Sequence, residues 1–204
     1  AGIPVANLGW VPLLTGLAMA DGVADVTSLQ VGLKWPNDVL VGDDEWRKVC
    51  GVLCEFVSPA QLVVAGAGLN VDQTRAELPI DGATSLALCG ADVSREEVLT
   101  AYLVALAKRH TQWVSGAWGE PSLSGDDPHA RGGEGPADLR SDYRARCRTI
   151  GAEVVVHLPG GARAEGVARG VDDEGQLVVE GCFGVRTFSA GDVVHVRPGP
   201  LALA

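Results

Sequence analysis

The stretch LKWPNDVLVGDDEWRKVCGVLCEF, residues 33–56, decides the fold of the first half of the chain. Pro36 disfavours a helix for the residue before it, and Pro-Asn-Asp is common turn chemistry, so Asn37 and Asp38 are expected at a bend between two strands. The run RKVCGVLCEF has the length and β-branched content of a strand. Connections this short leave no room for a crossover helix, which favours antiparallel pairing.

Two lysines flank this turn, Lys34 before it and Lys48 after it. From the residues alone, the commoner explanation is a hairpin with solvated charges. The alternative is a site in which both lysines face an anionic ligand and the Asn37 amide fixes that ligand. The local sequence leaves both interpretations open.

A second candidate site lies in QLVVAGAGLNV, residues 61–71. Gly66 and Gly68 would let the backbone approach a ligand closely, and Asn70 offers a donor and an acceptor. The pattern fails as a dinucleotide fingerprint because Val71 stands where the third glycine belongs. A glycine-rich strand end is also a common place for a β-bulge, so the signal is weak by itself.

Two amphipathic helices are predicted next. Residues 11–26 space leucines and valines at helical intervals, and Ser94 followed by Glu97 forms a capping box before a second helix. The apolar stripe predicted for the second helix consists of Val98, Leu99, Tyr102, Leu103 and Leu106.

The composition changes at residues 114–139, which are rich in Gly, Pro and acidic residues and have no apolar period. We interpret them as an insertion or linker between two domains, 1–113 and 140–204. The second domain begins with a short helix and continues as five short strands, a pattern typical of a small barrel or sandwich. Such a small unit buries little surface alone, so we expect it to pack on the first domain.

Composition excludes several classes of function. The 204 residues carry a net charge of −10, which argues against a nucleic-acid partner because binding to phosphates needs a basic surface. No apolar run reaches the ~18 residues of a membrane span and no signal peptide is recognisable, so we expect a cytoplasmic protein without membrane contact. Five cysteines without a CxxC pair indicate reduced, buried thiols rather than a metal site.

Several segments together resemble the biotin protein ligases, also called biotin–[acetyl-CoA-carboxylase] ligases. The matching pieces are LKWPNDVLV (33–41), RKVCGVLCE (47–55), VVAGAGLNV (63–71), ATSL (83–86) and the closing β-unit. The resemblance implies an α+β fold with a mixed, mainly antiparallel sheet related to class II aminoacyl-tRNA synthetases, followed by a C-terminal SH3-like β-barrel.

The same resemblance implies an enzyme that uses ATP, biotin and Mg²⁺. Biotin and ATP would first give biotinyl-5′-AMP and pyrophosphate. A lysine of the biotin carboxyl carrier protein of an acyl-CoA carboxylase would then attack the adenylate and become biotinylated. The family also allows a homodimer.

Residue roles follow from the resemblance as well. Lys48 matches the family's biotin-contacting lysine, and Asp38 matches an acidic residue implicated in the chemistry, through metal handling or activation of the incoming amine. The biotin slot is expected to include Lys48, Gly51, Val52, Gly66 and Gly68. The residues expected near the adenylate of ATP are Lys34, Asn37 and Asn70.

One departure from the family limits these expectations. The Gly-Arg-Gly-Arg-x-Gly loop that folds over the adenylate in family members is absent from these residues. The chain is therefore expected to correspond to the carboxyl-terminal two-thirds of such an enzyme. Two alternatives stay open: a truncated, non-catalytic remnant that binds the carrier protein, and a lipoate ligase-like acyltransferase, which shares the catalytic fold.

Overall fold

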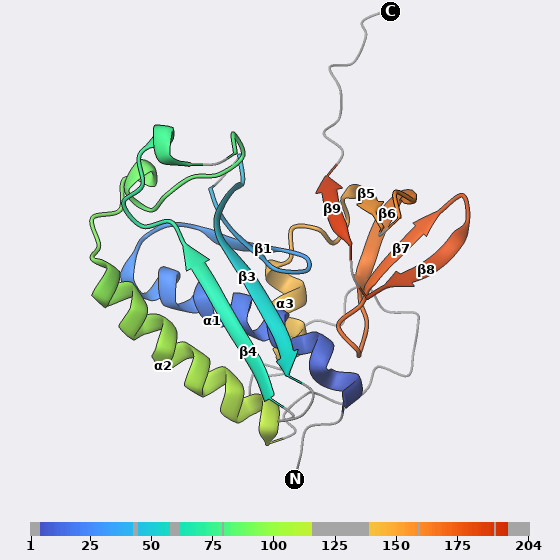
Figure 1. Ribbon diagram of the computed structural model, residues 1–204, viewed down its shortest axis with the longest axis horizontal. Coiled ribbons are helices and arrows are strands. Elements are labelled where there is room, and N and C mark those ends of the chain that lie inside the picture. Colours follow the sequence, from blue (N-terminus) through green and yellow to red (C-terminus); the bar gives the residue numbers. More distant parts are fainter. Residues whose placement is uncertain are drawn as a thin grey trace, which may run out of the picture.

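The described residues of the computed structural model form two antiparallel sheets and three α-helices (Figure 1). The structure describes residues 5–42, 45–57, 62–78, 80–115, 139–158, 160–189 and 191–195. The helices are α1 (Trp10–Val26), α2 (Arg95–Val114) and α3 (Leu139–Arg146), and short 3-10 helices occur as η1 (Val5–Gly9), η3 (Arg75–Glu77) and η4 (Ala87–Cys89). The predicted α+β class is confirmed.

The first sheet carries the strands predicted around the charged turn. Its strands, in spatial order, are β1 (Val31–Lys34), β2 (Asp38–Val41), β3 (Arg47–Val57) and β4 (Leu62–Leu69). Each strand is antiparallel to its neighbour. The short strand β2, which the apolar pattern alone did not single out, completes the meander because the bend at Asn37 returns the chain directly alongside β1.

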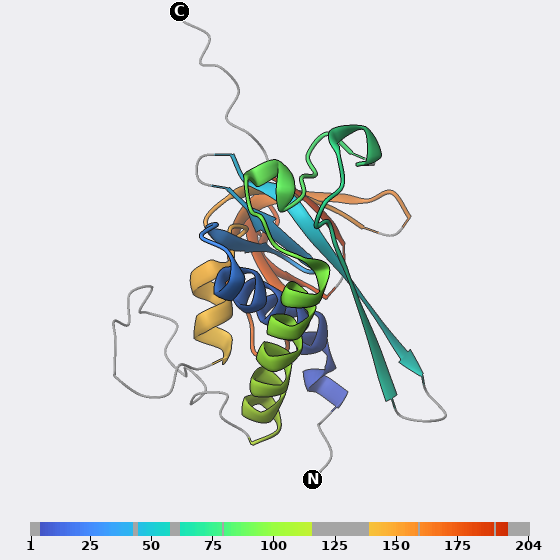
Figure 2. The ribbon, with the colours of Figure 1, turned by 90° about the vertical axis from the view of Figure 1, so that its left-hand side faces the viewer.

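Helix α1 packs on one face of this sheet and α2 packs along α1 (Figure 2). Trp10, Leu17 and Val23 of α1 are fully buried. Gly22 sets the separation of the two helices, because a Cβ there would lie 2.7 Å from the backbone nitrogen of Tyr102. The two helices therefore approach at backbone distance near the end of α1.

The buried stripe of α2 differs from the predicted one. The Ser94–Glu97 capping box is present, but Leu99 and Leu103 are 55% and 52% exposed. The residues of α2 that are buried are Val98, Tyr102, Ala105, Arg109 and Trp113. They follow one another at intervals of three or four residues, so they form the seam against α1, and the two leucines lie on the neighbouring flank.

The second sheet is open rather than closed. In spatial order its strands are β8 (Gly184–Phe188), β7 (Leu177–Gly181), β6 (Arg163–Val171), β5 (Glu153–His157) and β9 (Asp192–His195). Strand β6 bends at a register shift between Ala168 and Gly170 and pairs with both β5 and β7. Among the described residues the edge strands β8 and β9 do not pair with each other, so the predicted barrel closure is not confirmed.

One continuous core joins the two sheets, as expected for a small second unit that needs support. The cluster of buried side chains extends from Trp10 in α1 to Val193 in β9. The predicted insertion 114–139 lies, apart from its ends, outside the described residues. None of the described helices is long and apolar enough to cross a membrane.

Candidate active site

Four of the predicted site residues form one row across the first sheet. The strand register pairs Lys34 with Asp38, Asp38 with Gly51, and Gly51 with Gly68, so each of the four strands contributes one residue. Residues that pair directly in this way point to the same face of a sheet. The row therefore brings together positions that are up to 34 residues apart in the sequence.

Two ammonium groups share one carboxylate in this row. Lys48 Nζ lies 2.5 Å from Asp38 Oδ1, and Lys34 Nζ lies 3.8 Å from Asp38 Oδ2. The side chains are 35%, 23% and 15% exposed for Lys48, Lys34 and Asp38. With formal charges of two plus and one minus, this cluster has an excess positive charge that an anionic ligand would complement.

A strip without side chains begins beside this cluster. Along β3, residues alternate between the helix-covered face and the opposite, open face of the sheet, and Gly51, Gly66 and Gly68 all lie on the open face. Gly66 and Gly68 are exposed. A Cβ at either position would meet nothing nearer than a backbone oxygen at 3.8 or 3.9 Å. These three residues, called the glycine strip below, leave a flat surface for a ligand.

Gly51 has a stricter requirement than the other two glycines. A Cβ at this position would lie 3.1 Å from Lys48 Nζ and 3.2 Å from Lys48 Cε. Glycine at position 51 thus leaves room for the lysine side chain to reach Asp38. The neighbouring Leu53, 68% exposed on the same face, extends the strip with an apolar side chain.

The Val52 side chain does not join this group. It is 2% exposed and lies on the helix-covered face of β3. Its backbone is nevertheless used: Val52 N donates to Asn37 O at 2.8 Å, and Asn37 Nδ2 donates to Val52 O at 2.7 Å. This pair of hydrogen bonds fixes the turn 34–38 against β3.

Asn70 lies just beyond the carboxyl end of β4 and fixes the segment that follows. Asn70 Nδ2 donates to Thr84 O at 3.0 Å. Thr84 N in turn donates to Lys48 O at 2.8 Å, and Lys48 N donates to Gly82 O at 2.9 Å. The amides of Asn37 and Asn70 therefore both support the backbone on either side of Lys48, at opposite edges of β3.

A cleft of about 330 Å³ opens at the lysine cluster and includes the second sheet. Its walls are formed by Lys34, Trp35, Pro36, Asn37, Asp38, Lys48, Gly191 and Asp192. The sequence patterns indicated no role for Asp192, the first residue of β9, or for Gly191, which precedes it. Gly191 has φ +153°, and a Cβ there would lie 2.8 Å from the Val156 side chain, so glycine allows the approach.

The buried cysteine nearest the cluster is chemically quiet. Burial, opposed by the Lys48 charge, raises the pKa of the Cys50 thiol to about 12. A thiol with this pKa stays protonated near neutral pH and is neither a nucleophile nor a metal ligand. No group of three or more His, Cys, Asp or Glu side chains suitable for a metal is found in the described ranges.

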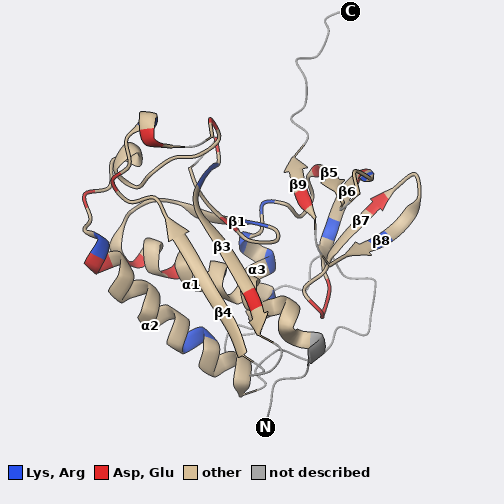
Figure 3. Ribbon diagram, in the orientation of Figure 1, with Lys and Arg blue, Asp and Glu red and all other residues tan. Residues whose placement is uncertain are grey.

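Charge is sparse along the neighbouring strand. Figure 3 shows β4 without a charged residue, in contrast to the region around β1. The site thus combines a charged end at the turn 34–38 with an uncharged surface formed by the glycine strip and Leu53. Such an arrangement suits a ligand with an anionic head and an apolar body.

Comparisons with known proteins agree with this geometry. Residues 149–196 match the family model described as "Biotin protein ligase C terminal domain". The chain is 39% identical over 200 residues to the biotin–[acetyl-CoA-carboxylase] ligase of Mycobacterium tuberculosis, covering 96% of this chain and 65% of that protein. It is 27% identical to the bifunctional ligase/repressor BirA of Bacillus subtilis, covering 94% of this chain and 54% of that protein.

Solved structures share the fold. The apo biotin protein ligase of Aquifex aeolicus superposes with a TM-score of 0.72 at 22% identity, covering 94% of this chain and 77% of that chain. The same ligase in complex with biotin and ATP gives a TM-score of 0.68 at 24% identity, covering 94% and 73%. The chain thus spans 65% of the length of its mycobacterial relative and about half the length of the BirA relative, and it is similar to the biotin protein ligases over most of its own length.

Proposed function

We propose that this chain carries the biotin-activating site of a biotin protein ligase. In the first reaction, a carboxylate oxygen of biotin attacks the α-phosphorus of ATP, the bond to the β-phosphate oxygen breaks, and pyrophosphate leaves. In the second, the lysine amine of a biotin carboxyl carrier protein attacks the acyl carbon of biotinyl-5′-AMP and releases AMP and a proton. Similarity to the biotin–[acetyl-CoA-carboxylase] ligase of Mycobacterium tuberculosis supports this assignment.

The observation that carries the proposal is the cluster of Lys48, Asp38 and Lys34 at the head of the glycine strip. Both reactants of the first step are anions, so the reaction needs cations where negative charge accumulates and needs the reactants aligned. Lys48 is a flexible point charge that would leave Asp38 and follow the biotin carboxylate into the adenylate. Lys34 would remain beside Asp38.

The glycine strip supports binding of the apolar part of biotin. A flat surface lets the ring system lie against the sheet backbone, and Leu53 adds apolar contact. Val52 would act through its backbone rather than as a wall of the slot, because its side chain is buried on the other face. Asn37 and Asn70 would lie near the adenylate and keep Lys48 in place through their amide hydrogen bonds.

Two carboxylates at the cleft fit a magnesium ion. Asp38 and Asp192 both line it, and Mg²⁺ prefers carboxylate oxygens together with phosphate oxygens. Asp38 Oδ1 is buried, pairs with Lys48 Nζ at 2.5 Å and has no hydrogen-bond partner among the described residues, so it would accept a further partner once Lys48 turns to the ligand. When bound, the ion would neutralise charge on the ATP phosphates.

Pyrophosphate release and carrier labelling test the proposal directly. This chain should release pyrophosphate only when biotin and ATP are both present, and should then label a lysine of the carrier domain. Release with lipoate in place of biotin would favour the lipoate ligase-like alternative. Carrier binding in isothermal titration, without biotin binding and without pyrophosphate release, would favour the non-catalytic remnant.

A further inference from the structure

The turn that carries the lysine cluster is anchored through a buried tryptophan. Trp35 stands between Lys34 and Pro36 and is 1% exposed. Its backbone N–H donates to Thr149 Oγ1 at 3.1 Å, and its indole Nε1–H donates to Gly175 O at 2.9 Å. Both acceptors belong to the part of the chain that follows α3, so the second unit accepts hydrogen bonds from both N–H groups of Trp35.

The first acceptor is held rigidly along the edge of β1. Thr149 is fully buried, and its Oγ1 lies 3.1 Å from His195 Nε2 in β9. The segment before it pairs with β1: Arg148 N donates to Leu33 O at 2.7 Å. Burial and the Lys34 charge lower the pKa of His195, which favours the neutral ring beside the hydroxyl. Thr149 therefore joins β9 to the turn 34–38.

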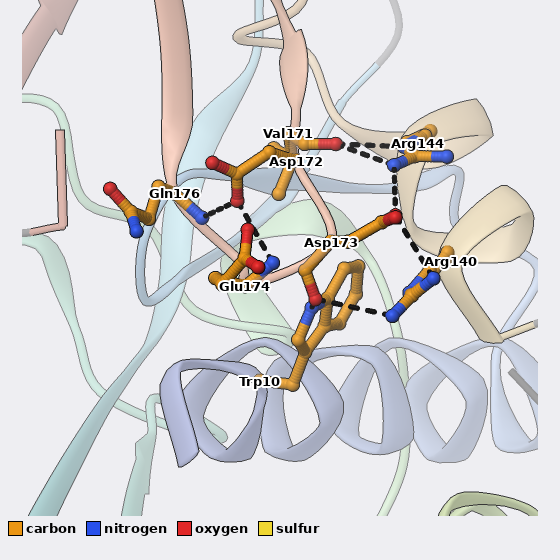
Figure 4. Close-up of polar contacts among 8 residues, drawn as sticks. All are labelled: Trp10, Arg140, Arg144, Val171, Asp172, Asp173, Glu174 and Gln176. Atoms are coloured by element: carbon orange, nitrogen blue, oxygen red, sulfur yellow. Dashed lines mark hydrogen bonds and ion pairs between the residues drawn. The ribbon is translucent and has the colours of Figure 1, made fainter. Parts of the chain in front are cut away.

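The second acceptor, Gly175 O, belongs to the hairpin turn 172–175. Figure 4 shows the polar contacts that hold this turn. Asp172 Oδ1 accepts from Gln176 N at 2.8 Å, which closes the turn from within. Arg140 of α3 pairs with Asp173 Oδ1 at 2.9 Å, and Trp10 Nε1 of α1 donates to Asp173 O at 2.9 Å. The Gly175 carbonyl is thus presented to Trp35 by a turn that α1 and α3 hold in place.

The hairpin turn lies so close to the start of α1 that position 175 requires glycine. Its φ is +84°, a conformation that side chains disfavour, and a Cβ would lie 3.0 Å from the backbone of Gly9. Since Gly9 precedes α1, the same residue brings the hairpin turn close both to α1 and to the indole of Trp35.

The turn 34–38 is consequently held from two sides. On one side Asn37 exchanges two hydrogen bonds with Val52 of β3. On the other side Trp35 makes two hydrogen bonds to the second unit. We propose that Trp35 is a positioning residue, through which Thr149 and the hairpin turn 172–175 set the placement of Lys34 and Asp38 for adenylate formation; this rests on the proposed ligase function.

Loss of either hydrogen bond should loosen the turn without removing a reacting group. Misplacement of catalytic groups by a fraction of an ångström to one ångström costs rate rather than ground-state affinity. We expect Trp35→Phe and Thr149→Val each to lower kcat for pyrophosphate release about tenfold, with a smaller change in the KM for biotin. Thr149→Ser, which keeps the hydroxyl, should restore most of the rate.

The matched control is Thr15→Val. This substitution also removes the hydroxyl hydrogen bond of a buried threonine, but Thr15 Oγ1 donates to Val11 O at 2.8 Å within α1, outside both the turn 34–38 and the hairpin turn 172–175. It should leave kcat within about twofold of the parent.

A second readout does not depend on activity. The Val52 amide donates to Asn37 O, so its hydrogen exchange reports on the closed state of the turn. In Trp35→Phe and Thr149→Val the Val52 amide should lose about tenfold more protection than the slowest amides of β6 and β7. In Thr149→Ser and Thr15→Val it should not.

The outcomes separate the two proposals. One outcome is that the parent releases no pyrophosphate while Trp35→Phe and Thr149→Val still lose Val52 protection selectively. That result would support the positioning role of Trp35 and contradict the ligase function of this chain. Equal losses of protection and rate in Trp35→Phe, Thr149→Val and Thr15→Val would show that these bonds serve only global stability, which would overturn the inference.

Discussion

Two of the three lysines in this chain meet at one carboxylate. Asp38 partly neutralises both. If the proposed site binds an anion, the arriving carboxylate or phosphate would replace Asp38 as the partner of Lys48, and Asp38 would keep Lys34 as its partner. The third lysine, Lys108, lies exposed on α2 and takes no part.

Adjacency along the chain explains which site residues could be predicted. Lys34, Asn37, Asp38 and Lys48 fall within a single antiparallel meander, and their proximity follows from strand pairing. The position of Asp192 could not be predicted in this way. Asp192 reaches the cleft because the second sheet packs against the first, and the spacing of neighbouring residues does not indicate that packing.

A methyl group at position 51 should disturb the lysine cluster. We expect Gly51→Ala to displace Lys48, because the added Cβ would lie 3.1 Å from its Nζ, and to raise the KM for biotin about tenfold. Gly170→Ala in β6, where a Cβ meets nothing within 4 Å, is the control. Steady-state pyrophosphate release measures both; equal KM values in the two variants would contradict the assigned role of the glycine.

The helices illustrate what periodicity can and cannot predict. The capping box located the start of α2 correctly, since it depends on residues close together in sequence. The choice of buried stripe was wrong for Leu99 and Leu103, since it depends on the partner surface. Close approach at Gly22 of α1 selects the seam through Tyr102, and a spacing of three or four residues fits either of two adjacent stripes.

An ion network ties the three α-helices together. Arg109 of α2 is 6% exposed, and its Nε lies 2.7 Å from Asp21 Oδ2 of α1. Arg109 also contacts Asp142 of α3. A second arginine of α3, Arg146, lies 2.7 Å from Asp21 Oδ1. Arg109→Ala would leave the carboxylates of Asp21 and Asp142 without their buried arginine partner. This substitution should therefore lower the free energy of unfolding by about 3 kcal/mol, measured by urea denaturation.

A surface ion pair provides the comparison for that network. Arg95 and Asp72 lie 2.5 Å apart, but both side chains are more than 60% exposed. Arg95→Ala should leave the denaturation midpoint unchanged, since exposed pairs are screened by water. If both arginine substitutions changed the midpoint equally, the burial argument would be wrong.

The two sheets share one hydrophobic core. Their buried side chains form a single cluster, and the second unit reaches into the cleft and into the turn 34–38. The expected small β-unit was correct in its five strands, whose alternation and turn residues are local signals. Barrel closure was not predictable from such signals, because it depends on how far β6 bends and where β8 and β9 end.

The β3–β4 hairpin extends beyond the helices and exposes apolar residues on its open face (Figure 2). Those residues are Leu53, Val57, Leu62 and Val64. Among the described residues, β4 is an edge strand of its sheet. An apolar patch beside a strand edge favours association between molecules. The homodimer remains a prediction.

A charge on this patch should reduce association. Val64→Lys places an ammonium opposite Glu55 in the strand register, so it should lower light scattering at fixed concentration at least about twofold without loss of stability. Val185→Lys, at an equally exposed but separate valine of β8, should not. Similar scattering from both variants would show that the hairpin patch is not the associating surface.

The lysine cluster is best tested by the rate of biotin- and ATP-dependent pyrophosphate release in Lys48→Ala and Lys108→Ala. We expect Lys48→Ala to lose about a hundredfold in rate, because it removes a positive charge from the reacting groups, and Lys108→Ala to retain the parent rate. If the Lys48→Ala rate stayed within about twofold of the parent, the cluster at Asp38 would not be the activating site.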